Sequence, residues 1–86
     1  MTRKQHNTEP GYIAERMNPF VAGSKVVIYI ADEQGLDVGD CKYAVVCDAH
    51  STLVGTTNIP RARESMKNPA EFCQDCRDIE DAEVGG

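Results

Sequence analysis

Hydrophobic and polar residues follow each other along the chain in a pattern that predicts strands first and helices later. The most hydrophobic segment, 25–31, is rich in β-branched residues and apolar on both faces, which favours a strand that is covered on both sides. Segments 42–46 and 51–55 also have the composition of strands. Because polar loops separate the three segments, we expect an antiparallel hairpin or a three-stranded sheet.

Helical spacing replaces strand character after residue 57. Asn58 is a suitable N-cap, and Pro60 would lie in the first turn, where a missing N–H costs little. Apolar residues then recur on one helical face, at Ile59, Ala62 and Met66. The pair Asn68-Pro69 should end this helix, because the residue before a proline is disfavoured in the α conformation.

A second short helix is predicted near the C-terminus. Asn68 and Glu71 have the spacing of a capping box, and apolar residues recur at Phe72, Cys76 and Ile79. This helix should carry Cys73 or follow it immediately. The predicted fold is a small α+β domain with a hairpin or three-stranded sheet and two short helices.

The N-terminal segment 1–24 is polar and contains Pro10 and Pro19, so we expect a mostly irregular arm with a short helical stretch at 13–17. It is either a free tail or an arm that docks through its apolar residues, Tyr12, Ile13 and Phe20. The predicted organisation is this arm, a folded domain at 25–80 and a flexible tail at 81–86.

Two pairs of potential metal ligands are the most specific chemical signal in the chain. Cys47 and His50 are separated by two residues, as are Cys73 and Cys76. Both members of such a pair can face one ion, and two pairs complete the tetrahedral shell of nitrogen and sulfur that Zn²⁺ prefers. The sequence therefore predicts a structural zinc site with the ligands Cys47, His50, Cys73 and Cys76. The α+β domain at 25–80 is accordingly predicted to be a zinc-binding domain that the ion stabilises.

The cysteines could serve purposes other than zinc binding. Two disulfides would need an oxidising compartment, but no apolar signal segment follows the N-terminus, so a cytoplasmic location is expected. A redox role for Cys73 and Cys76 is disfavoured, because such motifs follow an early strand of a βαβ unit. Cys41 is predicted to be a half-buried thiol that binds no metal. The alternative is that Cys41 replaces His50 as a zinc ligand. His6 is predicted to be solvated.

The two ligand pairs, one at a hairpin tip and one at a helix start, resemble the treble-clef and zinc-ribbon classes of structural zinc modules. The resemblance covers about residues 42–79 and differs in the extra helix between the pairs. Four protein ligands close the shell of the ion and leave no coordination position for water or a substrate. No arrangement of residues typical of an enzyme active site is apparent, so we do not expect an enzyme.

Charge distinguishes between the remaining function classes. Residues 26–86 carry five Lys or Arg against twelve Asp or Glu, and such an acidic surface repels phosphates. We therefore expect a protein-interaction module. The alternative is a nucleic-acid-binding zinc finger that uses Arg61, Arg63 and Lys67. No apolar run is long enough to cross a membrane.

Overall fold

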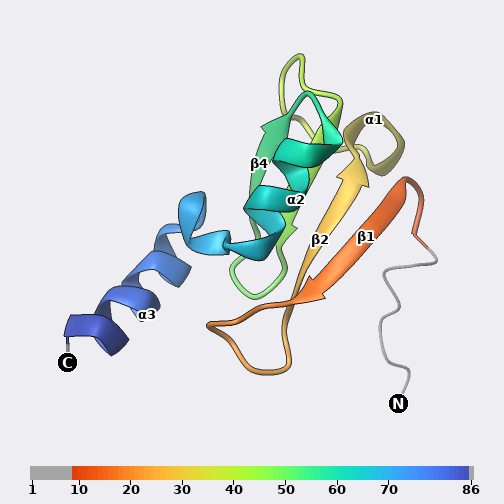
Figure 1. Cartoon of the computed structure of the whole chain (residues 1–86). Coiled ribbons are helices and arrows are strands. Elements are labelled where there is room, and N and C mark those ends of the chain that lie inside the picture. The colour runs from red at the N-terminus through yellow and green to blue at the C-terminus, as the bar shows by residue number, and fades with distance from the viewer. Residues whose placement is uncertain (1–8, 86) are drawn as a thin grey trace.

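The hydrophobic segment that begins at Lys25 forms β2 (Lys25–Ile30), a central strand of the sheet in the computed structural model (Figure 1). The structure describes residues 9–85, and within them the sheet is antiparallel with the strand order β1-β2-β3-β4. The other strands are β1 (Tyr12–Met17), β3 (Tyr43–Cys47) and β4 (Thr52–Thr56). The α+β class and the antiparallel meander of the last three strands are confirmed.

The N-terminal segment supplies a fourth strand that the sequence pattern did not predict. A short helical stretch was predicted at residues 13–17, but these residues lie in β1 and pair with β2, so that prediction is wrong. The irregular conformation predicted for the arm is also wrong over the length of β1. β3 pairs with only one edge of β2, and β1 pairs with the other edge. The hydrogen bonds and packing gained by this pairing outweigh the weak helical preference of residues 13–17. A register shift between Tyr12 and Ala14 allows two successive residues, Ile13 and Ala14, to pack against one core cluster. The buried members of this cluster are Val26, Ile28, Val45 and Ala62.

Helix α2 (Ile59–Lys67) covers one face of the sheet and begins as predicted (Figure 1). The Asn58 side chain accepts a hydrogen bond from the Arg61 backbone N–H at 2.8 Å, which caps the first turn. Ala62 is fully buried and belongs to the main core cluster, whose other fully buried members are Val26, Ile28 and Val45. These sheet residues alternate with residues of the opposite face, so α2 packs on one face only.

The connection to the last helix differs from the predicted capping box. Asn68 makes no side-chain cap, and the backbone N–H of Glu71 donates to the Asn68 carbonyl oxygen at 3.0 Å. The residues therefore form a short 3₁₀ helix, η2 (Pro69–Glu71). Helix α3 (Gln74–Gly85) follows Cys73 immediately, which confirms the predicted helix, and it includes most of the predicted tail.

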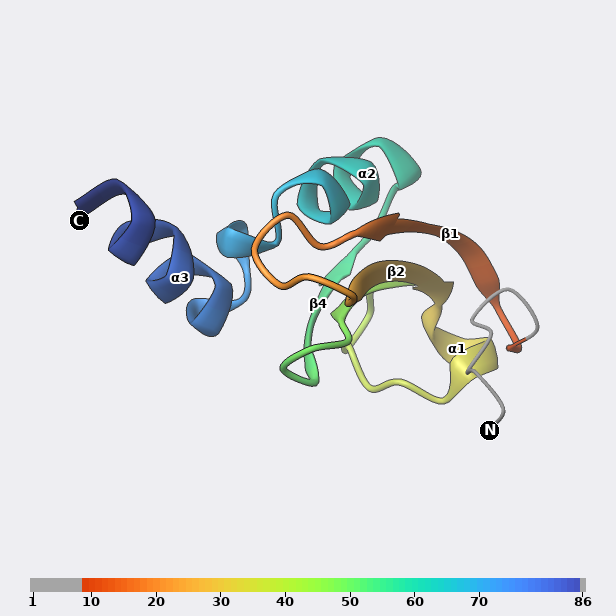
Figure 2. The same cartoon turned by 90° about the horizontal axis from the view of Figure 1, so that it is seen from below.

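The opposite face of the sheet is partly covered by a short helix, α1 (Ala31–Gln34), and by the loop that follows it (Figure 2). The sequence pattern did not predict α1. Gly35 ends this single turn with a φ of 77°, a conformation that glycine adopts without strain. The loop then packs Val38 and Cys41 against Gly55 of β4.

Candidate metal centre

The first ligand pair lies at the turn between β3 and β4. Cys47 is the last residue of β3, where pairing of Cys47 with Val26 holds its backbone in the sheet. The turn then closes through a hydrogen bond from the His50 N–H to the Cys47 carbonyl oxygen at 3.3 Å. Ser51 has a φ of 53°, which reverses the chain into β4. The turn thus brings Cys47 and His50 to the same side.

The second ligand pair lies at the start of α3. The Cys73 N–H donates to the Pro69 carbonyl oxygen at 2.8 Å, and the Arg77 N–H donates to the Cys73 carbonyl oxygen at 3.0 Å, so Cys73 lies between η2 and α3. Cys76 follows in the first turn of the helix. Unpaired N–H groups at a helix N-terminus favour thiolates. The Arg77 guanidinium also donates to the Ala70 carbonyl oxygen at 3.2 Å, which holds η2 against α3.

The four predicted ligands form one cluster, in which the ligand atoms of Cys47, His50, Cys73 and Cys76 lie within 4.8 Å of one another. The His50 Nδ1 atom is 3.4 Å from the Cys47 Sγ, 3.3 Å from the Cys73 Sγ and 3.5 Å from the Cys76 Sγ. The Cys47 and Cys76 sulfur atoms are 3.6 Å apart. Nδ1 is therefore the ring nitrogen that faces the sulfur atoms, and a single ion between the four atoms could contact all of them.

Apolar residues surround the cluster. The three cysteines are fully buried, while His50 is partly exposed. Ala70 forms one buried cluster with the three cysteines, and Phe20 and Phe72 pack against that cluster, so the β1–β2 loop and η2 both contribute to this environment. Burial of this kind excludes water from the sulfur atoms and leaves the imidazole at the surface.

The thiols do not ionise together in this environment. Burial raises the pKa of Cys47 to about 12, and hydrogen bonding to Cys76 adds to the effect. Burial also raises the pKa of Cys76. In Cys73 burial acts in the same direction, but hydrogen bonds from Cys76 and Thr52 outweigh it and lower the pKa to about 7. Three neighbouring thiolates repel each other, so a bound cation is needed to stabilise all of them.

Asn18 contacts the cluster and was not predicted as a site residue. Its side-chain Nδ2 lies 3.5 Å from the Cys47 Sγ and 3.5 Å from the Cys76 Sγ. In the sequence, Asn18 precedes Pro19 in a segment for which we expect a mostly irregular arm. Asparagine is common in turns, but nothing in the local sequence indicates that this turn approaches residues 29 and 58 positions away.

The other predicted residues lie outside the cluster. Cys41 is half-buried against β4, as predicted, and is not among the clustered ligands. Arg61, Arg63 and Lys67 are exposed on α2, and Arg61 lies 3.8 Å from the Glu71 carboxylate. The prediction for His6 falls outside the described residues.

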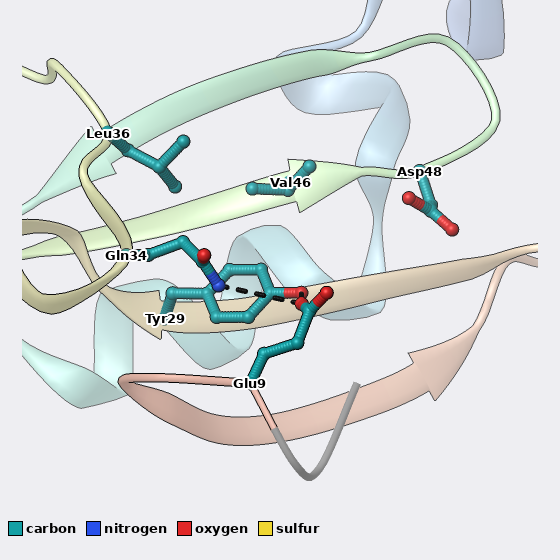
Figure 3. Close-up of a pocket in the computed structure, with 6 residues that line it drawn as sticks. All are labelled: Glu9, Tyr29, Gln34, Leu36, Val46 and Asp48. Atoms are coloured by element: carbon teal, nitrogen blue, oxygen red, sulfur yellow. Dashed lines mark hydrogen bonds between the residues drawn. The ribbon is translucent and has the colours of Figure 1, made fainter. Parts of the chain in front are cut away.

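A pocket of about 190 Å³ lies on the sheet face opposite α2 (Figure 3). In its interior the Tyr29 hydroxyl and the Gln34 amide both donate to the Glu9 carboxylate. Leu36, Val46 and Asp48 complete the lining. The pocket contains none of the four clustered ligands, so it is separate from the metal centre.

Comparison with known protein families, with curated proteins and with solved structures finds no match for this chain. Among the described residues, no helix has the length and apolar character needed to span a membrane.

Proposed function

We propose that this chain is a structural zinc-binding protein that acts as an interaction module for another protein. The ligand distances carry the first part of the proposal. With Zn–S bonds of about 2.3 Å and Zn–N bonds of about 2.0–2.1 Å, a tetrahedron has edges of roughly 3.8 Å between sulfurs and 3.6 Å between sulfur and nitrogen. In the structure the Cys47 and Cys76 sulfurs are 3.6 Å apart, the three distances from the His50 Nδ1 to sulfur are 3.3–3.5 Å, and all four ligand atoms lie within 4.8 Å of one another. Three sulfurs and one imidazole nitrogen are also the donors that zinc prefers.

The size of the chain supports a structural role for the ion. Domains of 86 residues bury a limited hydrophobic core and often need a metal or disulfides. Structural zinc contributes an apparent free energy of about 10–16 kcal/mol at neutral pH, which exceeds the stability of most small domains. Four protein ligands also fill the tetrahedral shell, so the ion would have no open position for a substrate.

Native mass spectrometry tests the zinc site directly. We expect one Zn²⁺ per chain at neutral pH, and we expect a strong chelator to remove the ion and most of the circular dichroism signal. A protein that is fully folded and cooperative without metal would contradict the proposal. The control is a chelator already saturated with zinc, which should leave the spectrum unchanged.

The surface opposite α2 supports a protein partner. By strand alternation, Leu53, Met17 and Val46 lie on this face, and Leu53 and Met17 are the large hydrophobic residues with the greatest exposure among the described residues. Residues 26–86 are acidic overall, which favours a protein partner over phosphates.

Paired surface variants test this protein-binding role. Leu53→Asp and Met17→Asp should reduce recovery of a partner from a cell extract without loss of zinc, because each puts a charge on the apolar part of this face. Thr57→Asp is a control that adds the same charge at an exposed position just beyond β4. Equal recovery by all variants would contradict the use of this face.

Nucleic-acid binding through α2 is the second candidate, because Arg61, Arg63 and Lys67 are all exposed on that helix. The ion pair between Arg61 and Glu71 reduces the positive charge on this surface of α2. We expect at most weak binding of DNA or RNA at physiological salt, unaffected by Arg63→Ala. A submicromolar complex that weakens steeply with salt, and that Arg61→Ala or Arg63→Ala abolishes, would favour this candidate instead.

A further inference from the structure

The Asn18 side chain connects the β1–β2 loop to two of the metal ligands. Its Nδ2 atom is 3.5 Å from both the Cys47 and the Cys76 sulfur atoms, and the residue is only 5% exposed. Cys47 and Cys76 belong to different ligand pairs. One carboxamide therefore contacts both halves of the cluster from a third part of the chain.

Hydrogen bonds inside the loop determine how this carboxamide is oriented. The Asn18 Oδ1 accepts from the Phe20 N–H at 2.8 Å and from the Val21 N–H at 3.3 Å. Both partners are donors, so the oxygen has to face the loop. The Asn18 backbone N–H donates to the Ser24 carbonyl oxygen at 2.9 Å, which closes the loop. The NH₂ group must then face the sulfurs.

We infer that Asn18 is a positioning residue of the metal centre, which stabilises the Cys47 and Cys76 thiolates by donating an N–H to each of them. This inference depends on the proposed zinc site. Three thiolates, one neutral imidazole and Zn²⁺ carry a net charge of −1, and a buried negative charge needs hydrogen-bond donors. Donors that contact metal ligands in this way orient the ligands and increase metal affinity. Because N–H donation withdraws electron density from sulfur, loss of Asn18 should also leave the two thiolates more reactive toward electrophiles.

Three variants separate this role from a purely structural one. Asn18→Asp retains the oxygen that accepts from Phe20 and Val21, but it replaces the donor with a negative charge beside two thiolates. Asn18→Ala removes both functions. Asn58→Ala removes the α2 cap, which has no contact with the cluster, and measures how much affinity falls when stability alone is lost.

Zinc affinity is measured by competition with a chromophoric chelator at a fixed neutral pH. We expect Asn18→Asp to weaken binding by about 10- to 100-fold, as is typical for residues that contact metal ligands. Asn58→Ala should weaken it by up to about fivefold. Asn18→Ala should lie between the two. Zinc release in excess N-ethylmaleimide should be faster in both Asn18 variants than in Asn58→Ala.

The order of the variants decides the outcome. If Asn18 served only the loop, Asn18→Ala would weaken zinc binding no more than Asn58→Ala does and would release zinc to N-ethylmaleimide no faster, and this result would overturn the inference. If Asn18→Asp does not fold with zinc, Asn18→Ala decides: a larger loss than in Asn58→Ala supports the inference, and an equal loss overturns it. Absence of zinc binding by the wild type would overturn the proposed function itself.

Discussion

The position of Cys41 in the fold distinguishes it from the three cysteines of the metal cluster. Cys41 lies in the loop over Gly55, and its sulfur would be 3.0 Å from a Cβ added there. Cys73 and Cys76 are fully buried in the cluster. We expect Cys41→Ser to retain one zinc per chain and to change stability by less than about 1 kcal/mol, because it touches no metal ligand. Cys73→Ser or Cys76→Ser should lose both zinc and fold.

Mass spectrometry and thermal melting of the three variants check this prediction. Cys41→Ser provides the matched control, since it makes the same chemical change outside the cluster. Equal damage from Cys41→Ser would place that residue in the ligand shell and release His50.

Tyr29 gives the chain a pH dependence that is independent of the metal ligands. Burial, then the hydrogen bond to Glu9, raises the pKa of Tyr29 above its ordinary value. The folded state therefore holds this proton more tightly than the unfolded chain does. Its stabilising effect is fully present below about pH 10 and is lost as the pH rises above that value.

Tyr29→Phe tests this dependence. The variant lacks the ionisable group, so its free energy of unfolding should fall less steeply above about pH 10 than that of the wild type. Denaturant titrations at several alkaline pH values measure the difference, with Tyr43→Phe as the control on the neighbouring strand. Parallel pH profiles for the wild type and Tyr29→Phe would contradict the prediction.

Among the secondary-structure elements, those with a strong local signal were predicted well. The β-branched run of β2 and the N-cap and proline of α2 identify these elements without tertiary information. The ligand pairs could be recognised because their two-residue spacing is a local pattern. β1 could not be predicted, since its residues have mixed character and become a strand by pairing with β2. The contact between Asn18 and two distant sulfurs also exists only in the folded chain.

Helix α3 is expected to be the least stable element of the described structure. Its main packing partner is η2, and it has no basic residue in its last turn. A helix of 12 residues is marginal in water without tertiary contacts, so α3 depends on the metal ligands at its N-terminus. In the zinc-bound protein, amides at 81–85 should exchange hydrogen much faster than those of β2.

Hydrogen-exchange mass spectrometry resolves this difference between elements. The amides of α2 serve as the reference, because that helix packs on the sheet through the fully buried Ala62. Protection at 81–85 equal to that of β2 would mean that α3 has support other than the metal centre.

In the molecule as a whole, the proposed ion connects three parts that are distant in sequence. Cys47 and His50 come from the β3–β4 turn, Cys73 and Cys76 from the start of α3, and Asn18 from the β1–β2 loop. The colours of Figure 1 show that these parts come from different stretches of the chain, and α2 and η2 connect β4 to α3. Metal binding and folding of the sheet should therefore be coupled.

This coupling predicts that a fragment starting at the predicted domain boundary is defective. Fragment 25–86 lacks β1 and Asn18, so the edge of β2 is exposed and the packing of Ile13 and Phe20 is lost. We expect it to bind zinc at least about tenfold more weakly than the whole chain and to have no cooperative thermal transition. Fragment 9–86 retains every described element and is the control. Equal melting temperatures and zinc affinities for the two fragments would show that β1 and its loop contribute nothing to the domain, and would support a zinc-binding domain that begins at Lys25.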